Sequence, residues 1–97
     1  MAMTRETIHY EGRVQGVGFR HTTAMTARRH AVAGYVQNLP DGRVKLVAEG
    51  DAEEVSGFVD AVQEAMAGHI ESVDSARSLG TGEYGRPGDD GAFRIRF

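Results

Sequence analysis

The sequence predicts a single α+β domain over residues 1–97, in which two helices cover one face of an antiparallel sheet. The predicted element order is βαββαβ, followed by a short extra C-terminal strand. Three observations support this prediction. Apolar and polar residues alternate near both ends of the chain, which is typical of half-buried strands. A strongly amphipathic segment follows the middle of the chain. A Pro-Asp-Gly turn at 40–42 joins two further strand-like segments.

The first strand is predicted over residues 7–14. Ile8, Tyr10 and Val14 fall on one face of this segment, with polar residues between them. A period of two indicates a strand with one buried face. His9 lies on the other face and is interpreted as an exposed strand residue without a catalytic role.

A helix is predicted over residues 20–31. Ala24, Ala27 and Ala31 recur at helical spacing, so we expect a small buried face that approaches the sheet closely. Three threonines in this segment lower its intrinsic helix propensity, and packing must therefore hold the helix in place.

Two strands, over residues 34–39 and 43–49, flank the turn at 40–42. Proline fixes φ in such a turn, and Asp-Gly supplies the positive φ of a tight hairpin. Asp41 could be mistaken for a catalytic carboxylate, but its role in the turn is sufficient to explain it. One face of the second strand carries Val44, Leu46 and Ala48.

The clearest helix is predicted to begin at Asp51 and to end near Gly68. Asp51 and Glu54 form a start signature of the capping-box type. Gly57 inside the helix costs about 1 kcal/mol relative to alanine. The apolar side chains of one stripe are predicted to face the core, and they are Val55, Phe58, Val59, Val62 and Met66.

The last third of the sequence is less regular. Residues 70–78 give a poor signal, although Val73 fits a strand with polar neighbours. Residues 80–91 are rich in glycine and predict a mobile loop, whose two adjacent aspartates are interpreted as solvated. Apolar residues alternate with arginines over 93–97, which predicts a final strand.

This order of elements predicts a ferredoxin-like sandwich built from two split βαβ units. If the third strand lies between the first and the second, those two run in the same direction. Their C-terminal ends then meet at one edge of the sheet. The loop over 15–20 and Asn38 would converge there, which makes Asn38 a candidate site residue.

The run from Gly12 to Arg20 contains three glycines and ends on an arginine. Glycine permits a positive φ and a close approach of the backbone to a ligand. Successive amide N–H groups and a following helix N-terminus form an anion site, to which Arg20 adds a planar cation. The run therefore predicts a phosphate cradle, with a plain turn as the alternative. No Gly-Lys-Ser/Thr follows, so it is not a nucleotide-binding P-loop.

Composition excludes several classes of protein. The net charge of −3 argues against bulk nucleic-acid binding. With no cysteine there is no disulfide framework, thiol nucleophile or thiolate metal site. No apolar run approaches a membrane span, and the N-terminus lacks a signal-peptide core. We therefore expect a cytoplasmic location.

Two segments resemble the signatures of the acylphosphatase family. Residues 12–20 resemble the first signature, and residues 34–50 resemble the second. The resemblance implies hydrolysis of a carboxyl–phosphate mixed anhydride to a carboxylate and inorganic phosphate, with no metal ion or organic cofactor. It also implies a small-molecule acyl phosphate as the substrate. We expect the protein to act as a monomer that binds neither membranes nor nucleic acids.

The resemblance also assigns roles to individual residues. The arginine matching Arg20 binds the phosphoryl oxygens, and the asparagine matching Asn38 orients the attacking water. Amides of the preceding loop contribute to phosphate binding, and here they belong to Gln15, Gly16, Val17, Gly18 and Phe19. His21, beside Arg20, is a further candidate for substrate contact.

The sequence departs from the family pattern at the end of the first helix. Ala31 occupies a position that is often glycine and serves as a left-handed cap. His30 stands where relatives often have an apolar residue. Both departures concern stability rather than the two site residues.

Two other functions compete with the enzymatic one. Similar domains occur fused to larger hydrogenase-maturation proteins, so a carbamoyl-phosphate-handling or regulatory module is one alternative. An RNA-binding domain of the same topology is the other. Such domains stack bases on aromatic side chains of the third strand, but residues 43–49 contain no aromatic residue.

Overall fold

The computed structural model describes residues 3–97, which form two helices and five strands. No helix in this part of the chain is long and apolar enough to cross a membrane. In chain order the elements are β1 (Thr4–Gly12), α1 (Phe19–Ala27), β2 (Ala33–Asn38), β3 (Val44–Gly50), α2 (Ala52–Ala65), β4 (Ile70–Leu79) and β5 (Phe93–Arg96).

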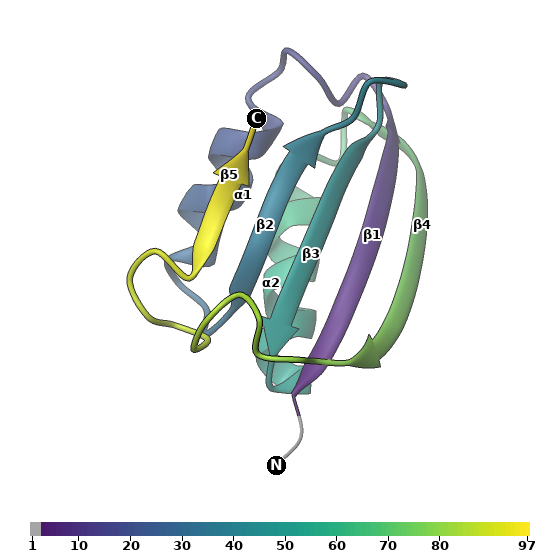
Figure 1. The fold of residues 1–97 in the computed structure, drawn as a ribbon. Helices are drawn as coiled ribbons and strands as arrows, with labels where there is room; N and C mark the ends of the chain where they lie inside the picture. Colours follow the sequence, from purple (N-terminus) through teal and green to yellow (C-terminus); the bar gives the residue numbers. More distant parts are fainter. Residues whose placement is uncertain (1–2) are drawn as a thin grey trace.

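The five strands form one sheet in the order β4-β1-β3-β2-β5, and both helices cover the same face (Figure 1). The predicted position of β3 between β1 and β2 is confirmed, and these neighbours pair antiparallel. The predicted antiparallel pairing holds for β1 to β4, whereas the extra last strand, β5, pairs parallel to β2. The β4–β5 loop crosses the sheet at the end where β2 begins, so β5 has to run in the direction of β2.

The core lies between the sheet and the helices. The predicted stripe of α2 is buried throughout, from Val55 to Met66. β1 begins and ends earlier than predicted. Its pairing with β4 shifts register between Glu11 and Gly12, and Val14 is fully buried just beyond the strand. The hydrophobic effect of this single cluster holds the two layers together.

Helix α1 differs from its prediction in length and in its buried face. It begins at Phe19 rather than at residue 20, and its buried residues are Phe19, Thr23 and Ala27. The ring of Phe19 packs against Tyr10 with centroids 5.1 Å apart. This bulky anchor, rather than the alanine spacing, sets the rotation of the helix. The buried Thr23 hydroxyl donates a hydrogen bond of 2.8 Å to the carbonyl oxygen of Phe19.

The end of α1 explains the departure at Ala31. The helix stops at Ala27, and the next three backbone N–H groups donate to carbonyls three residues earlier. Within residues 3–97 no residue other than glycine has a positive φ, so Ala31 does not adopt a left-handed cap. Its N–H instead donates to the Glu54 carboxylate at 2.8 Å.

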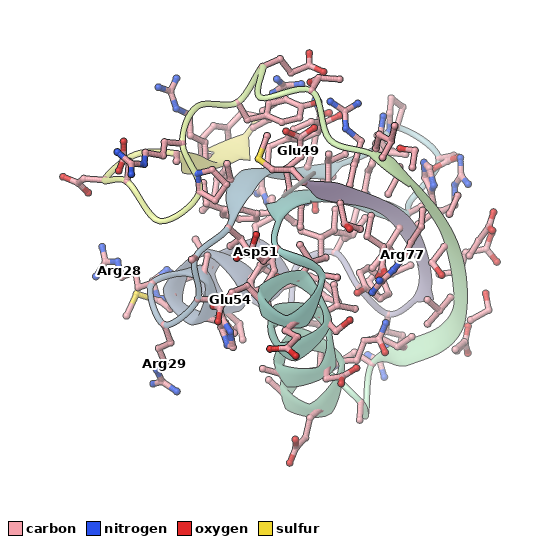
Figure 2. The ribbon with its side chains drawn as sticks, turned by 90° about the horizontal axis from the view of Figure 1, so that it is seen from below. Arg28, Arg29, Glu49, Asp51, Glu54 and Arg77 are labelled. Atoms are coloured by element: carbon pink, nitrogen blue, oxygen red, sulfur yellow. The ribbon has the colours of Figure 1, made fainter. Side chains whose placement is uncertain are left out.

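That bond also alters the start of α2. Asp51 is the N-cap residue, as predicted, but its side chain makes no capping hydrogen bond. The predicted capping box is therefore wrong in its side-chain contacts. Glu54 reaches toward the connection after α1, and Figure 2 shows Glu54 and Asp51 at this end of the helix.

Strand β4 explains why residues 70–78 gave a poor signal. From Glu71 to Leu79 every residue is exposed, so no buried face imposes an alternation of polar and apolar residues. Pairing with β1 over its whole length holds the strand in place. Arg77 adds an ion pair with Glu6 at 2.9 Å and a hydrogen bond to Ser56 on α2 at 2.7 Å.

The β4–β5 loop is anchored at its start, contrary to the expectation of a mobile loop. Glu49 lies fully buried under the loop on the sheet face opposite the helices (Figure 2). Its carboxylate accepts hydrogen bonds from the N–H groups of Thr81 and Gly82, both at 3.0 Å, and from Arg5 Nε at 2.7 Å. Burial alone would raise the pKa of Glu49, but these donors outweigh it and lower the pKa below its usual range.

Replacing Glu49 with glutamine is expected to destabilise the fold in a pH-dependent way. At pH 7 we expect a loss of roughly 1–3 kcal/mol in the free energy of unfolding, because buried hydrogen bonds to a charged group are weakened. A carboxylate with a lowered native pKa stabilises the fold above its unfolded pKa and loses that contribution as pH falls through the native pKa. Urea unfolding at pH 7, 5 and 3 should show the deficit shrinking toward pH 3. Glu64→Gln, on the exposed side of α2, is the matched control, and a deficit independent of pH would contradict the account.

Candidate active site

The two predicted site segments meet at one edge of the sheet. The glycine loop follows β1, and Asn38 is the last residue of β2. Because β3 lies between these strands, their C-terminal ends point the same way. The two segments line a cleft of about 270 Å³, and its lining includes Gly16, Gly18, Phe19, Arg20 and Asn38.

The glycine loop takes a backbone conformation that suits an anion site. Gly16 and Gly18 have φ values of 75° and 80°, and a Cβ at either position would meet nothing within 4 Å. Glycine is therefore favoured at both positions by the left-handed backbone conformation, and not because a side chain would clash with a neighbour. Gly18 is the N-cap of α1, so the free N–H groups and the positive dipole end of the helix lie in this cleft.

Arg20 supplies a cation beside these amides. It stands in the first turn of α1, and its guanidinium carbon lies 5.0 Å from the ring centroid of Phe97. Arg20 forms no ion pair with any other residue of 3–97. Its positive charge is therefore available to an anionic ligand in the cleft.

Asn38 lines the same cleft and carries an unusual polar atom. Its Oδ1 is buried and has no hydrogen-bond partner in the protein, and it is the only such side-chain atom among the residues described. A buried acceptor without a partner costs free energy unless a ligand or water satisfies it. The amide is therefore suited to hold a small hydrogen-bond donor next to Arg20.

Gln15 connects the two halves of the site. Its Nε2 donates to the carbonyl oxygens of Leu39 at 2.8 Å and Arg43 at 3.0 Å. The side chain thus ties the glycine loop to the β2–β3 hairpin that follows Asn38. Neither Gln15 nor Val17 contributes to the lining of the cleft, and Val17 packs against the core.

Replacing Gln15 with alanine is expected to lower the rate of any reaction that uses the loop and Asn38 together. Two hydrogen bonds of about 1 kcal/mol each are lost, and misplacement of the loop should reduce turnover by roughly tenfold. Steady-state kinetics on folded protein would measure the effect. Gln63→Ala is the control, because Gln63 donates to Tyr10 Oη at 3.4 Å and lies outside the cleft. Equal activity in both variants would contradict a positioning role for Gln15.

Sequence reasoning missed one wall of the cleft. Ile95 and Phe97 line it, as does Val14. The last strand was predicted, but its parallel pairing with β2 was not, and that pairing carries β5 to the edge where Asn38 lies. His21 also lines the cleft. Asp41 does not, and its carboxylate accepts from the backbone N–H of Arg43 at 3.1 Å, as its turn role predicts.

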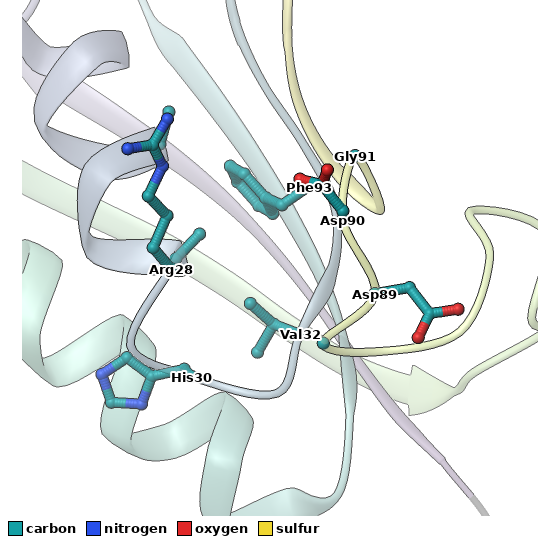
Figure 3. Close-up of a pocket in the computed structure, with 10 residues that line it drawn as sticks. Arg28, His30, Val32, Asp89, Asp90, Gly91 and Phe93 are labelled. Atoms are coloured by element: carbon teal, nitrogen blue, oxygen red, sulfur yellow. The ribbon is translucent and has the colours of Figure 1, made fainter.

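A larger hollow of about 430 Å³ lies elsewhere, between the end of α1 and the β4–β5 loop. Figure 3 shows Arg28 and His30 on one side of it and Asp89 on the other, with the Asp89 carboxylate directed away from them. The Nδ1 atom of His30 instead lies 3.9 Å from Oε1 of Glu54. Within the described residues, no two charged side chains of this hollow form an ion pair with each other. The hollow also lacks a glycine loop at a helix N-terminus, so it is a poorer candidate for an anion site despite its size.

Comparisons of the sequence and of the structure with known proteins point to one family. A family model described as acylphosphatase matches residues 6–93. An acylphosphatase of Paenarthrobacter aurescens is 44% identical over 87 residues, which cover 84% of this chain and 93% of that protein. One of Bacillus velezensis is 55% identical over 53 residues, covering 55% of this chain and 59% of that protein.

A solved structure gives the same result. The crystal structure of acylphosphatase from Bacillus subtilis superposes with a TM-score of 0.80 at 31% sequence identity. The match covers 97% of this chain and 99% of that one. It confirms the predicted ferredoxin-like arrangement with its additional last strand. The chain belongs to the acylphosphatase family.

Proposed function

We propose that this protein hydrolyses acyl phosphates, with Arg20 and the loop amides binding the phosphoryl group and Asn38 orienting the attacking water. One observation carries the proposal. Arg20, the N-terminal end of α1 and Asn38 line a single cleft. Within residues 3–97 the Arg20 guanidinium has no ion-pair partner and the buried Asn38 Oδ1 has no hydrogen-bond partner. The guanidinium and the helix N-terminus are complementary to the negative charge of a phosphoryl group. The amide oxygen can accept a hydrogen bond from a water molecule.

Arg20 and the backbone amides of the loop residues that line the cleft, Gly16, Gly18 and Phe19, bind the equatorial phosphoryl oxygens. Charge develops on these oxygens in the transition state, and donors fixed in place stabilise it without reorganisation. The positive φ of Gly16 and Gly18 fixes the loop before substrate arrives. The overall charge of −3 would repel an anion, so this local site has to attract it.

Asn38 Oδ1 accepts a hydrogen bond from water and holds its oxygen in line with the bond to be broken. The water oxygen forms a bond to phosphorus while the bond from phosphorus to the carboxyl oxygen breaks, and the electron pair leaves with the carboxylate. A neutral amide cannot take the proton of the water, so that proton passes to the phosphate. The products are a carboxylate and inorganic phosphate. A carboxylate is a good leaving group, so positioning supplies most of the catalysis.

Hydrolysis of benzoyl phosphate in the presence of EDTA tests the proposal. We expect rapid turnover by the wild-type protein, lost in both Arg20→Ala and Asn38→Ala. No turnover by a folded wild-type protein would overturn the catalytic claim and leave a phosphate-binding module. A rate that depends on EDTA would contradict a mechanism without a metal ion.

The pH dependence of the same reaction tests the proton's destination. His21 is the one histidine that lines the cleft within the described chain, so a protein base would most simply be this residue. We expect His21→Ala to keep the pH–rate profile of the wild-type protein. If the wild-type rate changed with pH over a range in which the rate of His21→Ala did not, the imidazole rather than the phosphate would accept the proton.

We further propose that the enzyme is a cytoplasmic monomer that acts on a small molecule and does not bind nucleic acid. The acidic net charge argues against nucleic-acid binding, and the small size of the cleft suits a small molecule. Sedimentation at micromolar concentration should give the mass of one chain, 10.5 kDa. A dimer, or retention on a nucleic-acid column at physiological salt, would contradict it.

A further inference from the structure

Phe97 is a large apolar side chain that the fold leaves almost entirely in solvent. Its exposed fraction is 96%, the highest among the large hydrophobic residues described as exposed. An aromatic ring in water forgoes the free energy that burial would give it. In this protein the ring does not stand alone, because it lines the cleft that holds Arg20 and Asn38.

Strand β5 carries a row of apolar side chains from the core to this cleft. Phe93 packs edge-on against Phe58 with centroids 5.2 Å apart, and Ile95 is half-buried against the same cluster. Phe97 is the next member of the row, two residues further along. The parallel register that pairs Gln37 with Arg96 brings Phe97 level with Asn38. The row of apolar side chains on β5 therefore extends from the hydrophobic core to the cleft that Arg20 and Asn38 line.

The ring also lies against the phosphate-binding cation. The 5.0 Å between the Arg20 guanidinium carbon and the Phe97 centroid is a cation–π contact. A substrate held by its phosphoryl group on Arg20 extends its acyl group within the same cleft. The apolar surfaces available to it there include Ile95 and the exposed ring of Phe97.

We propose that Phe97, supported by Ile95, forms the subsite for the acyl group and makes the enzyme prefer aromatic acyl phosphates to small ones. The inference rests on the proposed acyl phosphate hydrolysis. It assigns a specificity role to a residue that takes no part in the bond changes. A flat acyl group stacks on the ring, whereas an acetyl group is too small to cover it.

The preference is measured as the ratio of kcat/KM for benzoyl phosphate to that for acetyl phosphate. Phe97→Ala is expected to lower kcat/KM for benzoyl phosphate by about 3- to 10-fold, the range for one aromatic contact, and to change that for acetyl phosphate by less than about twofold. Phe97→Tyr should retain the wild-type ratio. Leu79→Ala is the matched control, because Leu79 is 75% exposed and lies on β4 at the far edge of the sheet.

Inhibition by inorganic phosphate separates this role from an effect on Arg20. If the ring contacts the acyl group, Phe97→Ala weakens inhibition by benzoate and leaves inhibition by phosphate unchanged. Equal losses with both substrates, together with weaker phosphate inhibition, would show that the ring only positions Arg20 and would overturn the inference. An unchanged substrate ratio would overturn it too. If the wild-type protein hydrolysed neither substrate, the proposed function itself would fail, which is a distinct result.

Discussion

Arg20→Ala is expected to lower kcat/KM for benzoyl phosphate by about 10²–10⁴. In the proposed mechanism the guanidinium makes about two charge-assisted hydrogen bonds to the phosphoryl group. Each would contribute roughly 1.5–3 kcal/mol, and each 1.36 kcal/mol corresponds to a factor of ten. Because the cation has no ion-pair partner among residues 3–97, its removal leaves no buried carboxylate unpaired. The fold should therefore remain intact, and circular dichroism would verify that.

A matched control and a conservative variant sharpen this prediction. Arg29→Ala removes an exposed arginine beyond the other end of α1 (Figure 2) and should leave the rate unchanged. Arg20→Lys retains the charge but loses the planar fork, so we expect partial recovery of the rate relative to alanine. A loss of less than tenfold in Arg20→Ala would contradict the assignment of this residue to the phosphoryl group.

Asn38→Ala is expected to lower kcat by about 10²–10³ with little change in KM, as for other residues that fix one reacting group. In the proposed mechanism the amide contacts the water rather than the phosphoryl group, so substrate binding should survive. The thermal midpoint should stay the same or rise, because alanine removes a buried oxygen that has no partner in the protein. Kinetics and thermal unfolding on the same preparation would measure both effects.

Gln37→Ala is the control for Asn38. Adjacent residues of a strand point to opposite faces of the sheet, and Gln37 does not line the cleft, so its loss should leave kcat unchanged. If Asn38→Ala lowered both the activity and the thermal midpoint, the amide would have a structural role. A rise in KM with unchanged kcat would place it on the substrate instead of the water.

The elements predicted best from the sequence are those whose structure depends on a local residue pattern. Helix α2 has a buried stripe at regular helical spacing, and the hairpin at 40–42 has a turn sequence with few alternatives. Helix α1 was harder, because one bulky residue, Phe19, outweighs the spacing of several alanines. Strand β4 could not be predicted from periodicity, since pairing with β1 holds an exposed strand in place.

The features of the site show the same difference between what local sequence predicts and what depends on long-range contacts. The convergence of the glycine loop and Asn38 followed from the order of elements once β3 was placed between β1 and β2. The bridge made by Gln15 depends on the contact of two loops that are 24 residues apart in sequence. Phe97 reached the cleft only through the parallel pairing of β5, a long-range feature without a local signal. Local chemistry could therefore be predicted from the sequence, whereas the contacts that complete the site depended on topology.

The fate of oxygen-18 during hydrolysis of benzoyl phosphate tests the central claim most directly. In water enriched in oxygen-18, attack on phosphorus places the heavy atom in inorganic phosphate, and mass spectrometry of both products locates it. The mechanism built on Arg20 and Asn38 predicts labelled phosphate and unlabelled benzoate. Labelled benzoate would show attack on the carbonyl carbon and would contradict the proposed mechanism.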